Sequence, residues 1–236
     1  MPPTDRPVVT VLAAIVVALG LVAAGWFAGR GMVQLRTGDR YVIVKGSAER
    51  IVDADLVVWP LPHGVGGNEL ADVQARLDAN TDAIRRFFTD AGFAEGDIVV
   101  SPPRLEDRWA YAYGDNRPPE RYRYSTTVSL RTSDVARALA AVRRSGVLVA
   151  QGVMIGEGSA PEFDYTRLND IKPSLIAEAT AAARDSALQF AKDSNSRLGG
   201  IRSANQGTVT ISERDQSSPQ VKRVRVVTTV EYFLRG

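Results

Sequence analysis

Few side chains in this sequence could carry out acid–base chemistry, and His63 comes first because it is the only histidine. It lies in a stretch rich in proline and glycine, which predicts an exposed loop. A nucleophilic triad would need a serine on a G-x-S-x-G turn, and the sequence contains none. The chain also lacks cysteine, which excludes disulfides, thiolate catalysis and cysteine-ligated metals. We therefore expect His63 to be a solvated loop residue, with a catalytic base as the alternative.

A pair of carboxylates, Asp53 and Asp55, is the second candidate. Residues two apart lie on one side of a strand, so the pair could exchange a proton or bind a cation. Charges at a strand end also discourage aggregation, and we favour that interpretation because no third ligand is evident nearby. The sequence thus predicts no catalytic residue, no metal site and no cofactor. A hydrolase that uses Asp53 or Asp55 stays open as an alternative.

The glycines of residues 64–67 resemble a phosphate-binding loop in glycine content alone. The Lys-Ser/Thr pair that completes such a loop is missing, and Asn68 would instead cap the helix that follows. We expect a flexible connector here. Anion binding at the start of that helix is the alternative.

Aromatic and arginine side chains gather in residues 108–124, the strongest candidate surface. Apolar and polar residues alternate on both sides of a turn at 114–119, which predicts a long antiparallel hairpin. We favour a ladder of aromatic side chains over the core. A protein interface, which favours Trp, Tyr and Arg, is the alternative, followed by a surface that binds nucleic acid or glycan. The predicted interface residues are Trp109, Tyr111, Tyr113, Arg121, Tyr122, Arg123 and Tyr124.

Composition is typical of a folded chain that does not bind nucleic acid. Of the 236 residues, 44% are hydrophobic and 24% are charged, which suffices for a sizeable core. The formal net charge is only +2, and residues 37–236 carry 26 basic and 26 acidic residues. Acidic residues at 106, 107, 115 and 120 also surround the hairpin, so we expect no nucleic-acid partner.

Hydrophobic periodicity predicts the elements that must position these residues. It favours an α+β fold: one antiparallel β-sheet with helices packed on one face, in a single domain over residues 41–236. Pro60 and Pro62 are expected to end the second strand, and Pro173 to begin the last helix. The other predicted helices run from Leu70 to Asp90 and from Asp134 to Arg144, and the other predicted strands begin at Asp97 and cover Val147–Ile155, Thr208–Glu213 and Val221–Leu234. The last helix is expected to end at Gly199–Gly200. Its inner stripe is predicted to consist of Ile176, Ala179, Ala183, Ala187, Phe190 and Ala191.

The N-terminal segment Val8–Ala28 has no charged residue. As a helix its 21 residues would span about 31 Å, close to the thickness of a bilayer core. We therefore expect a tail over 1–7, a transmembrane anchor over 8–28 and a linker over 29–40. A cleaved signal peptide is the first alternative, although Trp26 stands where a small residue is needed, and a buried core helix is the second.

Charge does not decide the orientation of such an anchor. Asp5 and Arg6 precede it, whereas Arg30, Arg36 and Arg40 follow it. The absence of cysteine fits export but does not establish it. We expect an inner-membrane protein with a single span and its C-terminal domain in the periplasm or outside the cell.

The order of segments resembles the SIMPL-domain family of bacterial envelope proteins. The matching segments are VKGSAERIVDADLVVWPL, NTDAIRRFFTDAGFAEGDIVVS, WAYAYGDNRPPERYRYSTTVSL, IAEATAAARDSALQFAKDSNSRLGGI and VRVVTTVEYFL. The resemblance implies an exported α+β domain without an agreed enzymatic activity, capable of ring-like assembly and linked to envelope stress. Many relatives have a longer insertion at the position of the loop Asp215–Gln220. The resemblance therefore does not extend to any assembly contact that relatives make through that insertion.

These observations lead to one expected function and one alternative. We expect a non-enzymatic domain that is held at the membrane by Val8–Ala28 and acts through self-assembly or through another envelope protein. A homo-oligomer is the expected state. The alternative is a periplasmic module that binds a small ligand or a peptidoglycan fragment beneath the hairpin.

Overall fold

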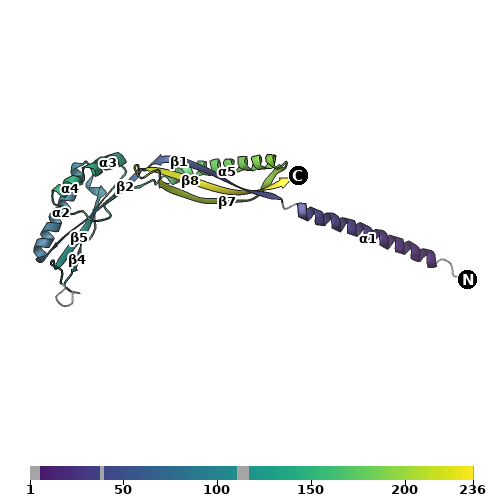
Figure 1. Ribbon diagram of the computed structural model, residues 1–236, viewed down its shortest axis with the longest axis horizontal. Helices are drawn as coiled ribbons and strands as arrows, with labels where there is room; N and C mark the ends of the chain where they lie inside the picture. Colours follow the sequence, from purple (N-terminus) through teal and green to yellow (C-terminus); the bar gives the residue numbers. More distant parts are fainter. Residues whose placement is uncertain (1–5, 38–39, 111–116, 236) are drawn as a thin grey trace. The chain divides into compact units, whose positions relative to one another are not determined.

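The computed structural model describes residues 6–37, 40–110 and 117–235. Helices and strands follow one another without regular alternation, as expected for an α+β chain (Figure 1). In chain order the elements are α1 (Arg6–Thr37), β1 (Tyr41–Asp53), β2 (Leu56–Gly67), α2 (Leu70–Asp90), the 3₁₀ helix η1 (Glu95–Asp97), β3 (Ile98–Val100), β4 (Arg104–Asp107), β5 (Tyr122–Thr132), α3 (Val135–Arg144), α4 (Gly146–Ala150), β6 (Glu162–Asp164), α5 (Leu168–Asp193), β7 (Arg197–Glu213) and β8 (Val221–Arg235).

The chain forms two compact units, each assembled from separate segments. The first unit comprises Met1–Ala48, Ile176–Thr208 and Val227–Gly236, and the second comprises Glu49–Leu175 and Val209–Val226. The predicted α+β class with antiparallel strands is confirmed, but the strands form two sheets rather than one. The predicted limits of a domain over 41–236 stay a prediction.

In the first unit, a three-stranded sheet of order β1-β8-β7 is covered on one face by α5. Four alanines of α5 are buried at helical spacing, namely Ala179, Ala183, Ala187 and Ala191. The predicted inner stripe is thus confirmed at its alanines. It is wrong at Phe190, whose side chain is exposed, because Phe190 lies outside the four-residue spacing on which Ala187 and Ala191 are buried.

The alanine stripe lets α5 approach β1 closely at Gly46. A Cβ atom at Gly46 would overlap the carbonyl oxygen of Ala179 and the backbone nitrogen of Ala183. Because these atoms belong to the helix backbone, no rotation of a side chain could relieve the overlap. Only glycine fits between the sheet and the helix at this point.

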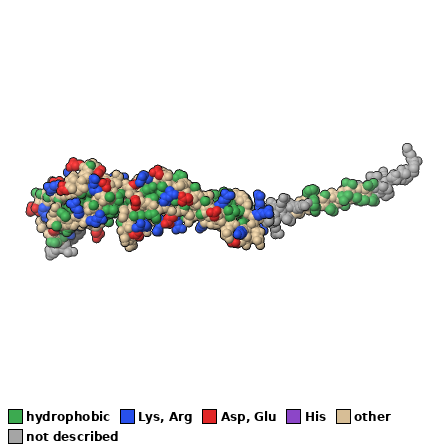
Figure 2. Space-filling view, turned by 90° about the horizontal axis from the view of Figure 1, so that it is seen from above, with side chains coloured by type: hydrophobic (Ala, Val, Ile, Leu, Met, Phe, Trp, Pro, Cys, Tyr) green, Lys and Arg blue, Asp and Glu red, His purple; other side chains and the backbone are tan. Residues whose placement is uncertain are grey.

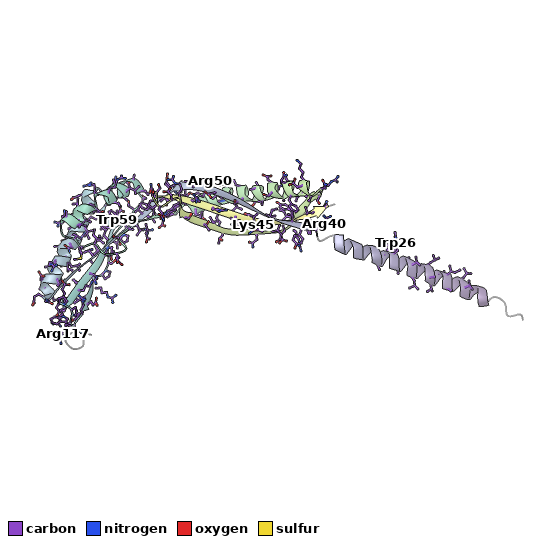
Figure 3. All side chains as sticks on the ribbon, in the orientation of Figure 1. Trp26, Arg40, Lys45, Arg50, Trp59 and Arg117 are labelled. Atoms are coloured by element: carbon purple, nitrogen blue, oxygen red, sulfur yellow. The ribbon has the colours of Figure 1, made fainter. Side chains whose placement is uncertain are left out.

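In the second unit, a five-stranded sheet of order β3-β5-β2-β6 also pairs β4 with β5. The helices α2, α3 and α4 cover one face of this sheet (Figure 1). Trp59 of β2 (labelled in Figure 3) is fully buried there, with Phe88 in edge-to-face contact. Other members of this core are Val57, Leu61, Ile84, Val128, Leu130, Ala138, Ala141, Leu148 and Phe163.

Local signals in the sequence explain where two of these helices begin and end. The predicted helix ending at Asp90 is confirmed as α2, and the chain leaves it through Gly92 at φ +90°. The predicted cap of α3 is also confirmed, because the Asp134 carboxylate accepts a hydrogen bond from the Arg137 N–H at 3.0 Å.

The prediction that Pro60 and Pro62 end the second strand is wrong, since β2 continues to Gly67. The Pro62 carbonyl accepts a hydrogen bond from Gly156, so its backbone points away from β5. A proline at such a position removes no hydrogen bond from the β2–β5 ladder. The structure therefore tolerates both prolines in a strand that the sequence predicts to stop.

Three other predicted elements differ from the structure. Residues 147–150 form a short helix instead of a strand, because Leu148 alone of that run turns into the core. The last helix begins at Leu168, and Pro173 lies inside it. The helix ends at Asp193, so Gly199 and Gly200 belong to β7, which begins eleven residues before the predicted Thr208. The predicted last strand is confirmed as β8.

The predicted anchor lies within α1, which is helical from Arg6 to Thr37. Hydrophobic side chains gather along the described part of α1, whereas charges of both signs are mixed elsewhere (Figure 2). Over the described part of the chain, however, no helix combines the length and the apolarity that a membrane crossing requires. The structure therefore does not support the predicted transmembrane anchor.

Replacing Gly46 tests the close packing of α5 on β1. We expect Gly46→Ala to lower the free energy of unfolding by about 3 kcal/mol, because the added methyl group meets backbone atoms. Gly200→Ala is the matched control, since no atom lies within 4 Å of its Cβ position. Urea unfolding measures both. An equal effect of the two substitutions would contradict the packing argument.

Candidate functional site

His63 is not in a solvated loop, as predicted, but is buried in β2 beneath α2. Its Nδ1 lies 3.0 Å from the Leu61 carbonyl oxygen and its Nε2 lies 2.9 Å from Thr81 Oγ1 of α2. Burial lowers the pKa of His63 more than the Leu61 contact raises it, so the ring is neutral at pH 7. A neutral ring that donates from Nδ1 to the Leu61 carbonyl accepts at Nε2, where it shares the single Thr81 hydroxyl proton with the Leu77 carbonyl, 2.9 Å from Thr81 Oγ1. The Nδ1 contact thus stays within β2, whereas the Nε2 contact joins the strand to α2.

The carboxylates of Asp53 and Asp55 have different environments. The Asp55 side chain accepts hydrogen bonds from the Thr166 N–H at 2.8 Å and the Arg167 Nε at 2.9 Å. Partial burial alone would raise the pKa of Asp55, but Thr166 and Arg167 outweigh it and hold that pKa below its usual value. Asp55 therefore joins two segments as an anion. Asp53 ends β1 and is exposed, so the two do not form a site together.

The glycines predicted to form a flexible connector instead form the end of β2. Asn68 does not cap α2 through its side chain. Its amide instead donates to the Pro119 carbonyl, and its Oδ1 accepts from the Arg121 N–H at 2.9 Å. Asn68 therefore fixes the approach to β5 rather than the start of the helix.

The predicted interface residues fall into three groups, of which the first surrounds Trp109. The guanidinium of Arg121 makes two contacts with the Asp107 carboxylate, at 3.2 and 2.8 Å, and lies over the Trp109 ring. The Arg121 hydrogen bond lowers the pKa of Asp107. Arg117 also lies over Trp109, near the end of the β4–β5 pair (Figure 3). This group is held together by contacts within the chain.

Tyr122 and Tyr124 form the second group, on the helix side of β5. Both pack against a small core of Val65, Val73 and Leu77. This position is the one expected for an aromatic ladder over the core, the interpretation that we favour from the sequence. Tyr111 and Tyr113 lie outside the described residues. A role of these tyrosines in an interface stays a prediction.

Arg123 alone forms the third group, on the opposite face of the sheet. The pairing of β2 with β5 places Gly66 beside Arg123, Gly64 beside Ser125 and Pro62 beside Thr127. Since Tyr124 and Thr126 face the helices, this second set faces away from them. The predicted polar face of the return strand is thus confirmed for Arg123, Ser125 and Thr127.

A groove of about 640 Å³ lies on this open face. Its size falls in the range of small-molecule sites. The sequence did not reveal this groove, because the prolines and glycines of residues 60–67 predict a loop. The period-two alternation of Val57, Trp59, Leu61, His63 and Val65 was the signal for a continuous strand. The lining residues from other segments include Ser101, Arg104, Arg108, Glu120, Met154 and Glu157.

Comparison with protein families identifies the domain that carries this groove. Residues 42–232 match the family model described as "SIMPL: Protein of unknown function (DUF541)". The chain belongs to the SIMPL family. A comparison with curated proteins found no match. The resemblance inferred from the order of segments is therefore confirmed, and the SIMPL domain covers both sheets.

Buried His63 should make the stability of the SIMPL domain depend on pH. Its folded pKa lies below the ordinary 6.5, so the unfolded chain binds the proton more readily. Stability should therefore fall as pH drops below about 6.5 and level off below the folded pKa. We expect His63→Gln to remove this slope. Urea midpoints between about pH 8 and about pH 5 measure it, and an unchanged slope in the variant would refute the assignment.

Proposed function

We propose that this chain is a membrane-tethered, non-enzymatic SIMPL domain that acts through self-assembly at the cell envelope. The observation that carries this proposal is the outer strand of the first unit, β7. In the sheet order β1-β8-β7, this strand pairs with β8 on one side, and within the described residues no strand pairs with its other side. An outer strand of this kind presents a row of backbone groups that can pair with another chain.

The part of β7 in the first unit lacks the features that usually protect a sheet edge. Residues 203–208 contain neither a charge nor a proline, and all six are exposed. Arg202 does not guard this edge, because it lies over the Tyr41 ring of β1 and 3.7 Å from Glu231 of β8. The other outer strand, β1, carries Lys45 in its first-unit part. Pairing of β7 between two copies is therefore the contact that we favour.

A tether would make such a weak contact effective. Copies held on one membrane surface meet at a higher local concentration than free copies. The support for a tether comes from the sequence, in which Val8–Ala28 has no charge and has the length of a membrane crossing. The result that no helix could cross a membrane holds for the side chains that the structure describes. The segment Val8–Ala28 contains four further side chains, those of Val8, Val9, Thr10 and Ala13. The periplasmic location and the link to envelope stress belong to this proposal.

Lysines placed on the β7 edge test self-assembly. We expect Asn205→Lys with Thr208→Lys to reduce the mass of the full-length protein, because antiparallel pairing of two copies would bring like charges together. The mass is measured by light scattering after size exclusion in a neutral detergent. Ala177→Lys with Ala181→Lys adds the same charge to the exposed side of α5 and should leave the mass unchanged.

Two outcomes would contradict assembly through β7. A wild-type protein that is monomeric at high concentration would exclude self-assembly. An oligomer that survives the β7 lysines, but is lost with the α5 lysines, would place the contact on the helix instead.

Charges placed in Val8–Ala28 test the tether. We expect Val16→Asp with Leu19→Asp to move the full-length protein from the membrane fraction to the aqueous fraction, since each aspartate costs about 3 kcal/mol in a bilayer. Val16→Ile with Leu19→Met is the control that keeps the segment apolar. Wild-type protein recovered intact from the aqueous fraction without detergent would refute the tether.

A further inference from the structure

We propose that the groove on the open face of the second unit binds a small organic ligand that carries at least two carboxylate or phosphate groups. This site is independent of the β7 edge, since all of its residues belong to the second unit. The groove lies where the sheet has no covering helix, so a ligand of this size can reach it from solvent. Three features of the groove support this class of ligand: its arginines, its floor and its acidic residues.

Three arginines line the groove, namely Arg104, Arg108 and Arg123. In the part of the chain that the structure describes, no carboxylate lies within ion-pair distance of any of them. Other arginines of the same unit do have such partners: Arg121 pairs with Asp107 and Arg167 with Asp55. Guanidinium groups bind carboxylate and phosphate through paired hydrogen bonds. The three groove arginines are therefore available to an anion.

The arginines converge from three parts of the chain. Arg123 is on β5 and Arg104 is on the neighbouring strand β4, where it pairs with Ser125. Arg108 follows β4 and is partly buried, which limits its freedom. Because the antiparallel register fixes two of these positions on one face, the positive charges are brought together before any ligand binds.

The floor of the groove is flat and polar. Gly64 and Gly66 expose backbone there, and the hydroxyl groups of Ser125 and Thr127 stand on the neighbouring strand. A Cβ atom at Gly64 would come within 3.1 Å of Ser125 Cβ. Any larger side chain would therefore occupy the space that a ligand needs. Hydroxyl groups beside arginines are suited to the remaining oxygens of a bound anion.

Acidic residues limit the kind of anion. Glu120 and Glu157 line the groove, with the Glu120 carboxylate over Gly66. Glu106 lies opposite Arg123 in the β4–β5 register, on the same face of the sheet. A simple polyanion would meet repulsion from these carboxylates. A ligand that also carries a hydroxyl or amino group could donate to them. The groove thus favours an acidic metabolite with donor groups over an extended acidic polymer.

Thermal unfolding with citrate and with pyrophosphate tests this proposal on the full-length protein. Citrate offers three carboxylates and a hydroxyl group, whereas pyrophosphate offers phosphate alone. We expect at least one of them to raise the unfolding midpoint in a saturable way at constant ionic strength, because a ligand stabilises the state that binds it. A shift with citrate alone indicates a carboxylate ligand, and one with pyrophosphate alone indicates a phosphate ligand.

Substitutions in the groove separate specific binding from general screening. We expect Arg104→Gln with Arg123→Gln to weaken the apparent affinity for the ligand at least tenfold, as judged from the concentration that gives half of the midpoint shift. The midpoint without ligand should stay unchanged, because neither side chain has an ion-pair partner among the residues that the structure describes. Arg131→Gln is the matched control. Arg131 is exposed on the same face of β5, about 26 Å along the strand from Arg123, and does not line the groove.

Two results would overturn the proposal. The first is the absence of a saturable shift with either citrate or pyrophosphate. The second is an equal shift in the wild type and in the Arg104, Arg123 double variant. Both results come from thermal unfolding and do not depend on oligomer mass. Ligand binding in the groove can therefore be refuted while assembly through β7 is upheld, and assembly can be refuted while ligand binding is upheld.

Discussion

The antiparallel register of β2 on β5 is the constraint on which the second unit depends. It pairs Trp59 with Leu130 and Leu61 with Val128, and so directs four large apolar side chains to the helices. The same register directs Gly66 and Arg123 to the other face. A shift by one residue would exchange the two faces, burying an arginine and exposing a tryptophan. The core and the groove therefore have a single cause.

The buried histidine supports this register through its hydrogen bonds. His63 occupies the helix side of β2 between Leu61 and Val65, and its ring joins the strand to Thr81 of α2. A polar group at such a depth is tolerated only when its hydrogen bonds are satisfied, as both of its nitrogens are. Asp55 acts similarly near the other end of β2, where it holds Thr166 and Arg167. Both side chains that the sequence singles out as candidates for catalysis thus hold separate segments together.

Both surfaces that we propose to be functional lie where a sheet is left without cover. In the first unit, α5 seals one face through its alanines and Gly46, and the strand β7 stays open at the edge. In the second unit, the helices seal one face and leave the groove with its arginines on the other. Small residues serve both arrangements, because they allow close packing in one place and space for a ligand in another.

The sequence by itself determined the class of fold, the family, the capped helix α3, the alanine stripe and the alternation of β5, because these depend on short-range periodicity and on residue types. It did not reveal that Pro60 and Pro62 lie within a strand, since that depends on which side of β2 lacks a partner. Nor could it bring Gly64, Gly66 and Arg104 to one groove, because this depends on the pairing of both β2 and β4 with β5. Whether a charged side chain finds a partner is decided in three dimensions. The tertiary structure alone could therefore distinguish Arg121, which pairs with Asp107, from Arg123, which has no carboxylate within ion-pair distance among the described residues.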